Sequence, residues 1–288
     1  MSGLITEYLG AGLAAARPAT PVLSTGAAGY YVATDTGVIS VWNGTFWSDL
    51  NGWNLLTETG TRILSAAATI TIALPGVVTS NAHGFAANQA VVFRTTGALP
   101  TGLALNTTYY VRNPTANTFE VSATVGGASI NTSGVQSGTH SVVKAASWVF
   151  STNVASVNFT NLSPYSELLV IMRNVTCSVS GLRSIRVSDD NGGSFYAGTA
   201  YAFIQEDGAD SVSSAISMHG TVTTAARSGI VGLKGINIFG TPKAFETINR
   251  TAFGGGLFLG SLNPINAFQI LNTSGGNLTG GSIFVFGK

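Results

Sequence analysis

The stretch from residue 81 to residue 124, NAHGFAANQAVVFRTTGALPTGLALNTTYYVRNPTANTFEVSAT, decides how the middle of the chain folds. It contains three runs rich in β-branched and aromatic residues, AVVFRT, TTYYVRN and TFEVSAT, which are separated by Gly, Pro and Asn. Such runs between turn residues are typical of short strands. Two similar runs flank the stretch, ATITIAL at 68–74 and THSVVK at 139–144. Five short strands predict a small β-barrel module over residues 68–145.

The residues before this barrel predict an N-terminal attachment module over 1–60. Residues 29–48, GYYVATDTGVISVWNGTFWS, hold three aromatic or β-branched runs with Asp-Thr-Gly and Asn-Gly turn signals between them. This pattern predicts a β-meander. Residues 4–16, LITEYLGAGLAAA, have apolar side chains near one helical face and are followed by two prolines, so they predict a peripheral arm that is either a short helix or an irregular strap.

The last part of the chain, residues 146–288, contains eight to ten further strand candidates. In one of them Val157 and Phe159 alternate with polar residues, as in a strand with one buried face. The closing strand Ile283–Phe286 is apolar on both faces, which predicts a central position in a sheet or a place in an interface. We therefore predict an all-β chain whose C-terminal domain is an antiparallel, jelly-roll-like β-sandwich.

The composition argues against nucleic acid as a partner. Only 9% of the residues are charged and the formal net charge is +1. Phosphate binding requires clustered Lys and Arg, and the 13 such residues here are scattered singly. A surface with so few charges also suits a chain that buries part of its surface against other copies of itself.

The sequence predicts neither membrane insertion nor export through a signal peptide. The longest apolar stretch, residues 63–78, is broken by polar residues, Pro75 and Gly76, and is shorter than the ~20 residues that a spanning helix needs. The N-terminus lacks the basic region of a signal peptide. The single cysteine, Cys177, permits no intrachain disulfide, so we expect folding in a reducing cytoplasm.

The sequence lacks the patterns that carry catalysis or bind metals. Its three histidines, His83, His140 and His219, are isolated and show no zinc-site spacing. There is no G-x-S-x-G and no P-loop. We therefore expect a protein that is not an enzyme and that uses no metal or other cofactor, with His83 making a structural hydrogen bond in a turn.

Residues 188–195, SDDNGGSF, match the pattern S-x-D-x-G-x-[ST]-[FW]. This segment resembles the Asp-box hairpin of sialidases, in which the box is a structural turn away from the active site. The resemblance implies that Asp190 accepts backbone hydrogen bonds, that Gly192 has a positive φ, and that Phe195 anchors the hairpin in the core.

Two alternatives for this acidic region remain open. A calcium site would take oxygen ligands from 189–191 and from a second acidic loop at 206–210. A glycosidase would need two carboxylates about 5 to 9.5 Å apart, and the same acids are its only candidates. The residues concerned are Asp189, Asp190, Asn191, Glu206, Asp207 and Asp210.

Aromatic residues next to this segment suggest a glycan-binding groove. Sugar recognition combines an aromatic face with amides and carboxylates that bind the hydroxyl groups. In this interpretation Tyr196 and Tyr201 face solvent beside Asn191, Gln205 and Asp207. In the alternative, both tyrosines lie in the sheet core or a subunit interface, where their hydroxyls bond to the backbone, and we expect this placement for at least one of them.

Two segments carry a resemblance to virion proteins of tailed bacteriophages. The meander resembles segments common in phage tail and fibre proteins. The H-G-F-x5-V-x-F core of the barrel resembles a module of phage tail proteins and, in fold only, the small β-barrel half-domain of ubiquitin-activating enzymes. The matching residues are Tyr31, Asp35, Gly37, Trp42, Asn43, Gly44 and Trp47 in the meander and His83, Gly84, Phe85, Val91 and Phe93 in the barrel.

These resemblances imply a structural component of a virion appendage, such as a fibre, spike or decoration protein. Such a chain is assembled in the host cytoplasm, binds other virion proteins through its N-terminal part, and displays the later domains, with host-surface glycan as a candidate ligand. A purely architectural decoration protein is the alternative, and a glycan-cleaving spike is the third. Resemblance to fibres implies a homotrimer, for which Ile283–Phe286 and the N-terminal arm are the candidate contacts.

Overall fold

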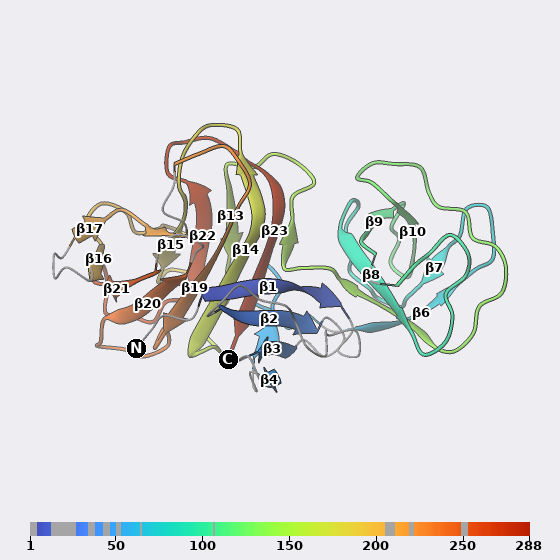
Figure 1. Cartoon of the computed structure of the whole chain (residues 1–288), viewed down its shortest axis with the longest axis horizontal. Helices are drawn as coiled ribbons and strands as arrows, with labels where there is room; N and C mark the ends of the chain where they lie inside the picture. The colour runs from blue at the N-terminus through green and yellow to red at the C-terminus, as the bar shows by residue number, and fades with distance from the viewer. Residues whose placement is uncertain are drawn as a thin grey trace.

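The computed structural model shows an all-β chain, as predicted (Figure 1). It describes residues 5–12, 27–33, 38–42, 47–49, 53–63, 65–105, 107–204, 211–218, 222–248 and 253–288. Every regular element in these ranges is a β-strand. None of them forms a helix long and apolar enough to cross a membrane.

The N-terminal strands form a sheet of their own. Its order is β1-β2-β3-β4, and β2, β3 and β4 are joined in antiparallel fashion, which confirms the predicted meander. The two turn signals of the meander lie outside the described residues. The strands are β1 (Ile5–Gly12), β2 (Ala27–Ala33), β3 (Val38–Trp42) and β4 (Trp47–Asp49).

In the segment 4–16, for which a short helix or an irregular strap was predicted, the described residues 5–12 form a strand. β1 pairs with β2 in parallel, with a register shift between Tyr8 and Gly10. Gly10 and Gly12 each disfavour a helix by about 1 kcal/mol relative to alanine, whereas Thr6 and Tyr8 have high strand propensity. Pairing with β2 therefore outweighs the weak helical periodicity that the sequence shows.

The middle of the chain forms the predicted barrel, which is closed in the order β10-β7-β6-β11-β8-β9. The predicted run ATITIAL ends as a strand at Ile70, and Leu74 is 76% exposed in the following loop. A short extra strand, β7, completes the barrel. Its strands are β6 (Ala66–Ile70), β7 (Val78–Thr79), β8 (Ala90–Thr95), β9 (Tyr109–Arg112), β10 (Thr118–Ser122) and β11 (His140–Lys144).

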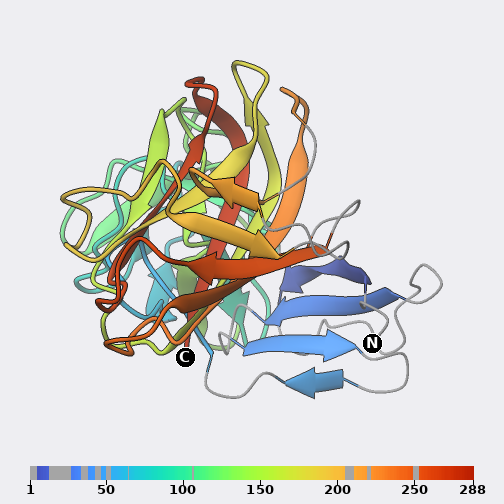
Figure 2. The same cartoon turned by 90° about the vertical axis from the view of Figure 1, so that its left-hand side faces the viewer.

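Two antiparallel sheets form the C-terminal sandwich (Figure 2). The larger has the order β12-β23-β14-β19-β20-β21-β16-β17, with β5 also paired to β23, and the smaller has the order β13-β22-β15-β18. Consecutive strands repeatedly change sheet, for example at β13–β14–β15–β16 and at β21–β22–β23. This alternation gives the sandwich its jelly-roll-like character.

The bounds of the sandwich strands are as follows. The larger sheet contains β5 (Asn54–Leu55), β12 (Trp148–Val149), β14 (Glu167–Cys177), β16 (Tyr201–Ile204), β17 (Ser211–Ser213), β19 (Arg227–Lys234), β20 (Lys243–Ile248), β21 (Phe253–Phe258) and β23 (Leu278–Gly287). The smaller sheet contains β13 (Ser156–Phe159), β15 (Arg183–Ser188), β18 (Ile216–Ser217) and β22 (Ala267–Asn272).

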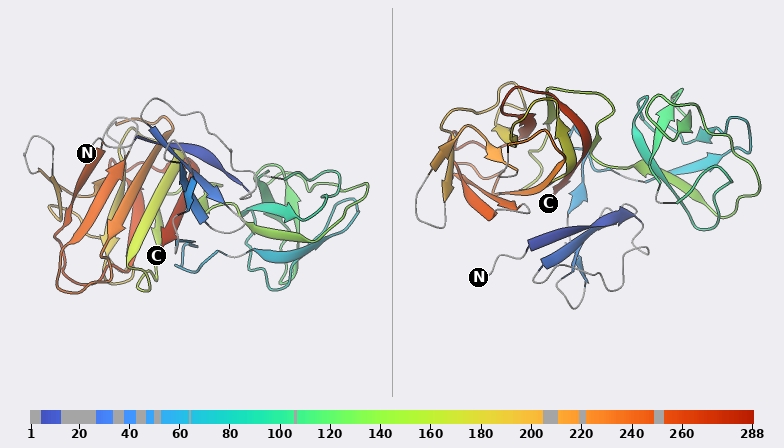
Figure 3. Two further views of the ribbon diagram at one scale, coloured as in Figure 1. Left: turned by 60° about the horizontal axis from the view of Figure 1, so that its bottom comes forward. Right: turned by 45° about the horizontal axis from the view of Figure 1, so that its top comes forward.

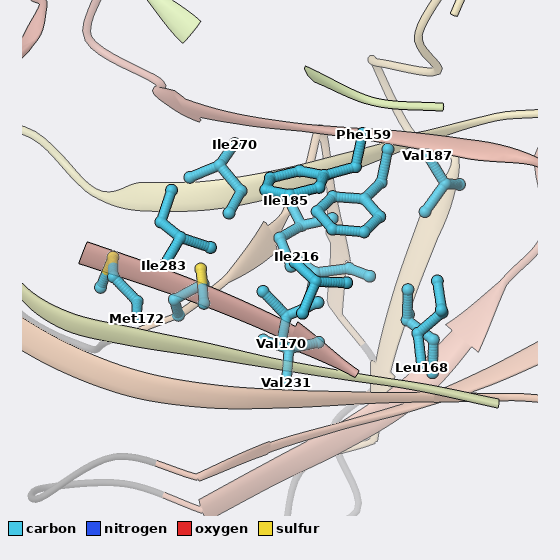
Figure 4. Packing of buried hydrophobic residues seen from close by; sticks show 14 of the residues in the cluster. Phe159, Leu168, Val170, Met172, Ile185, Val187, Ile216, Val231, Ile270 and Ile283 are labelled. Carbon is cyan, nitrogen blue, oxygen red and sulfur yellow. The ribbon is translucent and has the colours of Figure 1, made fainter. Parts of the chain in front are cut away.

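The main core lies between the two sheets (Figure 4). Val170 and Ile283 enter it from the larger sheet, while Ile185 and Ile270 enter it from the smaller one. The ring of Phe159 stacks on the ring of Phe268 with centroids 4.9 Å apart. Burial of alternate residues on both sheets provides most of the hydrophobic stabilisation of this domain.

A second core covers the outer face of the larger sheet and explains why the closing strand is apolar on both faces. Phe284 and Phe286 pack there against Leu55, Ile63 and Val143, while the neighbouring residues of β23 face the main core. Residues 54–63 therefore belong to the sandwich, across the boundary predicted near residue 60. The strand Ile283–Phe286 is buried within one chain, so it is not the subunit contact that was expected.

The three parts lie side by side. Figure 3 shows the barrel beside the sandwich in both views, and the N-terminal sheet near the end of the sandwich that holds the C-terminus. The barrel is connected to the sandwich at both ends of its sequence. The preceding segment 53–63 and the following residues Ala146–Val149 both pack or pair on the larger sheet.

Candidate functional site

The predicted site residues that the structure describes lie where three loops meet at one end of the sandwich. The segment SDDNGGSF follows β15 and leads to β16. The loop after β13 contributes Asn161, and the loop after β21 contributes Ser261 and Asn266. Hydrogen bonds join these loops through Asp189 and Asn191.

Asp190 makes the turn that the Asp-box pattern predicts. Its Oδ1 accepts a hydrogen bond from the backbone N–H of Ser194 at 2.9 Å and from Oγ of Ser188 at 2.6 Å, and its Oδ2 accepts one from Oγ of Ser194 at 2.7 Å. These bonds, led by that from Ser188, hold the pKa of the Asp190 carboxyl far below its usual range. Gly192 has φ +90°, as expected.

Two details of the Asp-box prediction are wrong. β15 belongs to the smaller sheet and β16 to the larger one, so the turn lies in a crossing between sheets and not in a hairpin. Phe195 is only half-buried and lies over Gly192, where its Cζ is 3.5 Å from the position of an added Cβ. The next residue, Tyr196, packs against the core instead.

Asp189 joins the loop after β15 to the loop after β21. Its Oδ2 accepts hydrogen bonds from Oγ of Ser261 at 2.6 Å, Nδ2 of Asn263 at 3.0 Å and the Tyr196 hydroxyl at 3.0 Å. Burial alone would raise the pKa of Asp189, but these hydrogen bonds outweigh it and the pKa lies below its ordinary value. The carboxylate therefore acts as an ionised acceptor that fixes the two loops.

Asn191 makes the corresponding connection to the loop after β13. Its Oδ1 accepts the backbone N–H of Asn161 at 2.7 Å, and its Nδ2 donates to Oδ1 of Asn161 at 2.9 Å. Its own backbone N–H donates to Oδ1 of Asn266 at 2.7 Å. The side chain that was predicted to bind glycan is thus engaged in holding the loops together.

The two predicted tyrosines have different environments. Tyr201 is 0% exposed, so its ring has no face available to a sugar. Its hydroxyl accepts the backbone N–H of Val187 at 2.9 Å and donates to the carbonyl of Tyr196 at 3.2 Å. This is the core placement with backbone partners that was the alternative for at least one tyrosine. Tyr196 is half-buried, and its ring meets Phe258 edge to face at 5.0 Å.

The other half of the predicted groove, Gln205 and Asp207, lies outside the described residues, as do Glu206 and Asp210 of the calcium and glycosidase alternatives. Within the described ranges no three residues among His, Cys, Asp and Glu form a group that could hold a metal ion. The carboxylates of Asp189 and Asp190 are engaged by protein donors. The described half of this region therefore has the chemistry of a structural network.

The described histidines also have structural partners. Nδ1 of His83 accepts the backbone N–H of Phe85 at 2.9 Å, which is the turn hydrogen bond that was predicted. The ring of His140 lies between Thr95 and Gln136, with nitrogen–oxygen distances of 2.8 and 3.0 Å. His219 lies outside the described residues.

No motif in the sequence singles out the residues that complete the loop network. Ser261, Asn263 and Asn266 lie in SLNPIN, and Asn161 precedes Ser-Pro. The available signal was the density of Asn, Ser and Pro in these two loops, which is typical of turns whose side chains bond to nearby backbone. That signal indicates turns but does not indicate which loops meet.

Near this network, two loops of the sandwich carry exposed apolar side chains. Hydrogen bonds from the buried side chain of Lys243 connect these loops. Nζ of Lys243 donates to the carbonyls of Ile238, Thr241 and Leu262, and burial lowers its pKa. Phe239 is 74% exposed on one of these loops. Ile238, Leu259 and Leu262 are also exposed apolar residues of the sandwich.

Comparison of the chain with protein-family models, with curated proteins and with solved structures found no match.

Proposed function

We propose that this chain is a structural, non-catalytic component of a tailed-bacteriophage virion appendage, such as a fibre, spike or decoration protein. The observation that carries the proposal is that the two segments resembling phage tail and fibre proteins, residues 29–48 and 81–124, belong to separate small β modules outside the sandwich. A small N-terminal sheet, and a barrel inserted into the larger domain, suit a chain that is attached at its N-terminal part and displays that domain.

The side chains at the end of the sandwich support a non-catalytic role. Asp189 and Asp190 are acceptors for Ser, Asn and Tyr donors, which keeps both carboxylates ionised and occupied. A general acid would need a raised pKa, and both of these are lowered. The same network favours an architectural role for these loops over glycan binding at Tyr196 and Tyr201.

Self-association, most simply as a homotrimer, belongs to the proposal. Only 9% of the residues are charged, and apolar side chains such as Phe239 are exposed. Covering such surface stabilises an oligomer. Because Ile283–Phe286 is buried within the chain, the contacts must involve other surfaces. Light scattering of the purified chain tests this, and a stable monomer at micromolar concentration would contradict it.

The decisive experiment locates the chain in particles of the phage that encodes it. Purified particles should contain the chain by mass spectrometry, and their electron cryo-microscopy map should show its barrel and sandwich on the particle exterior. Absence of the chain from washed particles, with the chain present in the lysate, would overturn the proposal. Host-surface polysaccharide incubated with the purified chain should yield no shortened products, and turnover would contradict the non-catalytic part.

A further inference from the structure

A cleft lies at the junction of the barrel and the sandwich, far in sequence from the Tyr196 loops. It is formed by the barrel residues 84 and 86–90, by Lys144 at the end of β11, and by residues 146–149 and 151, with Glu58 from the segment before the barrel. Its volume is about 260 Å³. This is close to the lower end of the range for small-molecule sites, roughly 300 Å³, and suits a ligand of about one sugar ring.

The charges in the cleft cancel each other. Nζ of Lys144 lies 3.2 Å from Oε2 of Glu58, and the two side chains are 17% and 29% exposed. Among the described residues that line the cleft, no other is ionisable. An anionic ligand would have to compete with Glu58 for the one cation, so the site favours a neutral ligand.

Fixed amides lie on the barrel side of the cleft. Oε1 of Gln89 accepts the backbone N–H of Ala86 at 3.1 Å, and Oδ1 of Asn88 accepts the backbone N–H of Gly126 at 3.0 Å. Each amide is therefore held by one hydrogen bond before any ligand arrives. Preorganised amides of this kind lose little conformational entropy when they bind hydroxyl groups.

Trp148 lines the sandwich side of the cleft, and its side chain also packs against the main core. Trp148 is half-buried, and it meets Phe150 edge to face with centroids 6.3 Å apart. This packing fixes the indole on the edge strand β12. The residues around it in the cleft are mostly small, including Ala86, Ala87 and Ala146, so bulky neighbours do not fill the space.

We propose that this cleft binds one neutral sugar ring. A pyranose has an apolar C–H face that an indole can cover and hydroxyl groups that match the amides and the Glu58–Lys144 pair. A nucleotide or an acidic sugar would need an unpaired cation, and a purely apolar ligand would leave the amides without water. The inference goes beyond the proposed function, because the cleft belongs to the isolated chain and needs no virion.

The test is saturation-transfer NMR on the full-length chain with neutral methyl glycosides of glucose, mannose, galactose and N-acetylglucosamine, and with methyl glucuronide as the anionic probe. At least one neutral glycoside should bind, with a Kd on the order of 1 mM for so small a ligand. Methyl glucuronide should show no binding. Failure of all neutral probes, or equal binding of the glucuronide, would overturn the inference.

Variants assign the binding to this cleft. Trp148→Ala should weaken binding by at least about tenfold, because it removes the stacking surface. Since Trp148 also contacts the core, Ala87→Leu provides a second variant, in which an exposed residue at the cleft is enlarged and the fold is left intact. Val135→Ser, at an 89% exposed barrel residue outside the cleft, is the control and should bind as the unaltered chain does.

Binding that survives Ala87→Leu, or that Tyr196→Phe abolishes while Ala87→Leu does not, would place the sugar elsewhere and reject the cleft. None of these outcomes depends on whether the chain is found in phage particles. The inference and the proposed function can therefore fail separately.

Discussion

Individual polar side chains fix the loops of the sandwich, and Tyr201, which is 0% exposed, is one of them. Its hydroxyl is both a donor and an acceptor, and it satisfies one backbone group of β15 and one of the loop that follows. A buried backbone group that loses its partner costs about 1–3 kcal/mol, more than the hydrogen bond itself contributes. Tyr201 therefore stabilises the crossing between the two sheets through two hydrogen bonds.

Tyr201→Phe should lower the free energy of unfolding by about 1–3 kcal/mol, because it keeps the ring and leaves the Val187 N–H and the Tyr196 carbonyl without that partner. Urea unfolding measures the change. Tyr196→Phe is the matched control, and its effect should be smaller because Asp189 keeps its bonds to Ser261 and Asn263. Equal losses in the two variants would contradict the assignment.

Alkaline pH should destabilise the sandwich through the same residue. Burial raises the pKa of Tyr201 to about 12, against 10.0 for an ordinary tyrosine. Because the folded pKa is the higher one, the stabilisation is fully present below pH 10 and is lost as the pH rises from 10 to 12. Unfolding free energies measured across this window should fall less steeply for Tyr201→Phe. Identical slopes would show that other groups dominate.

The sequence predicted the contacts of Asp190 and not those of Asp189, for a physical reason. Asp190 bonds to residues two and four positions away, so a short pattern contains all its partners. Asp189 bonds to Ser261 and Asn263, more than seventy positions away, and only the folded sandwich brings them together. Tyr201 was similarly ambiguous, because its place in the core depends on the crossing from β15 to β16.

At the scale of elements, the glycine-rich strand β21 shows how closely the strands of the larger sheet pack. An added Cβ at Gly256 would overlap the carbonyl oxygen of Ala202 on β16 and would lie 2.6 Å from Cζ of Phe245 on β20. At Gly232 on β19, by contrast, an added Cβ would meet nothing within 4 Å. Close packing therefore excludes a side chain at Gly256 but not at Gly232.

Gly256→Ala should destabilise the protein by about 1–3 kcal/mol, as expected for overpacking against backbone. Gly232→Ala is the matched control and should be neutral or stabilising by about 0.4–1 kcal/mol, because it restricts only the unfolded chain. Thermal unfolding monitored by circular dichroism compares the two. A stable Gly256→Ala variant would mean that β16 and β21 are not packed as described.

Strand patterns differ in how well they predicted the elements. Val157 and Phe159 alternate with polar residues and are buried on β13, as expected from a period of two. The continuous apolar run of β23 was correctly interpreted as buried on both faces, but the second covering layer comes from residues 54–63 together with Val143 and Ala146, which no local pattern connects to it. The prediction of a helix or strap at β1 was wrong, because pairing with β2 determines the conformation of a segment whose own propensities are weak.

At the scale of the whole molecule, the barrel is an insertion into a sandwich that begins before it. Leu55 pairs with Phe286, Leu56 lies in the main core, and the Tyr165 hydroxyl donates to the carbonyl of Gly60 at 2.7 Å. The two ends of the barrel meet each other, since Ala66 on β6 pairs with Val142 on β11. Composition changes along the sequence revealed the barrel but could not reveal that the preceding segment returns to the sandwich.

This arrangement predicts that a fragment of residues 146–288 is not the complete domain. It lacks Leu55, Leu56 and Ile63, so it should expose Phe284 and Phe286 on one face of β23. Each fully buried side chain of this kind contributes about 1.5–3 kcal/mol. The stability lost with several of them is therefore comparable to the whole free energy of unfolding of a domain, about 5–15 kcal/mol. The fragment should bind a hydrophobic dye and aggregate.

A chain that joins residues 53–63 to 145–288 through a short Gly-Ser linker is the matched comparison. Because the barrel's ends are adjacent, removing it should leave the sandwich, Leu55 and Ile63 in place, while the second core loses only Val143 and the partly buried Val92. We expect this chain to be monodisperse, to unfold cooperatively and to bind little dye. Size-exclusion chromatography, dye fluorescence and thermal unfolding distinguish the two. If residues 146–288 alone are as soluble and as stable as the joined chain, then the segment 53–63 covers the sheet without stabilising it, and the sandwich is complete from residue 146.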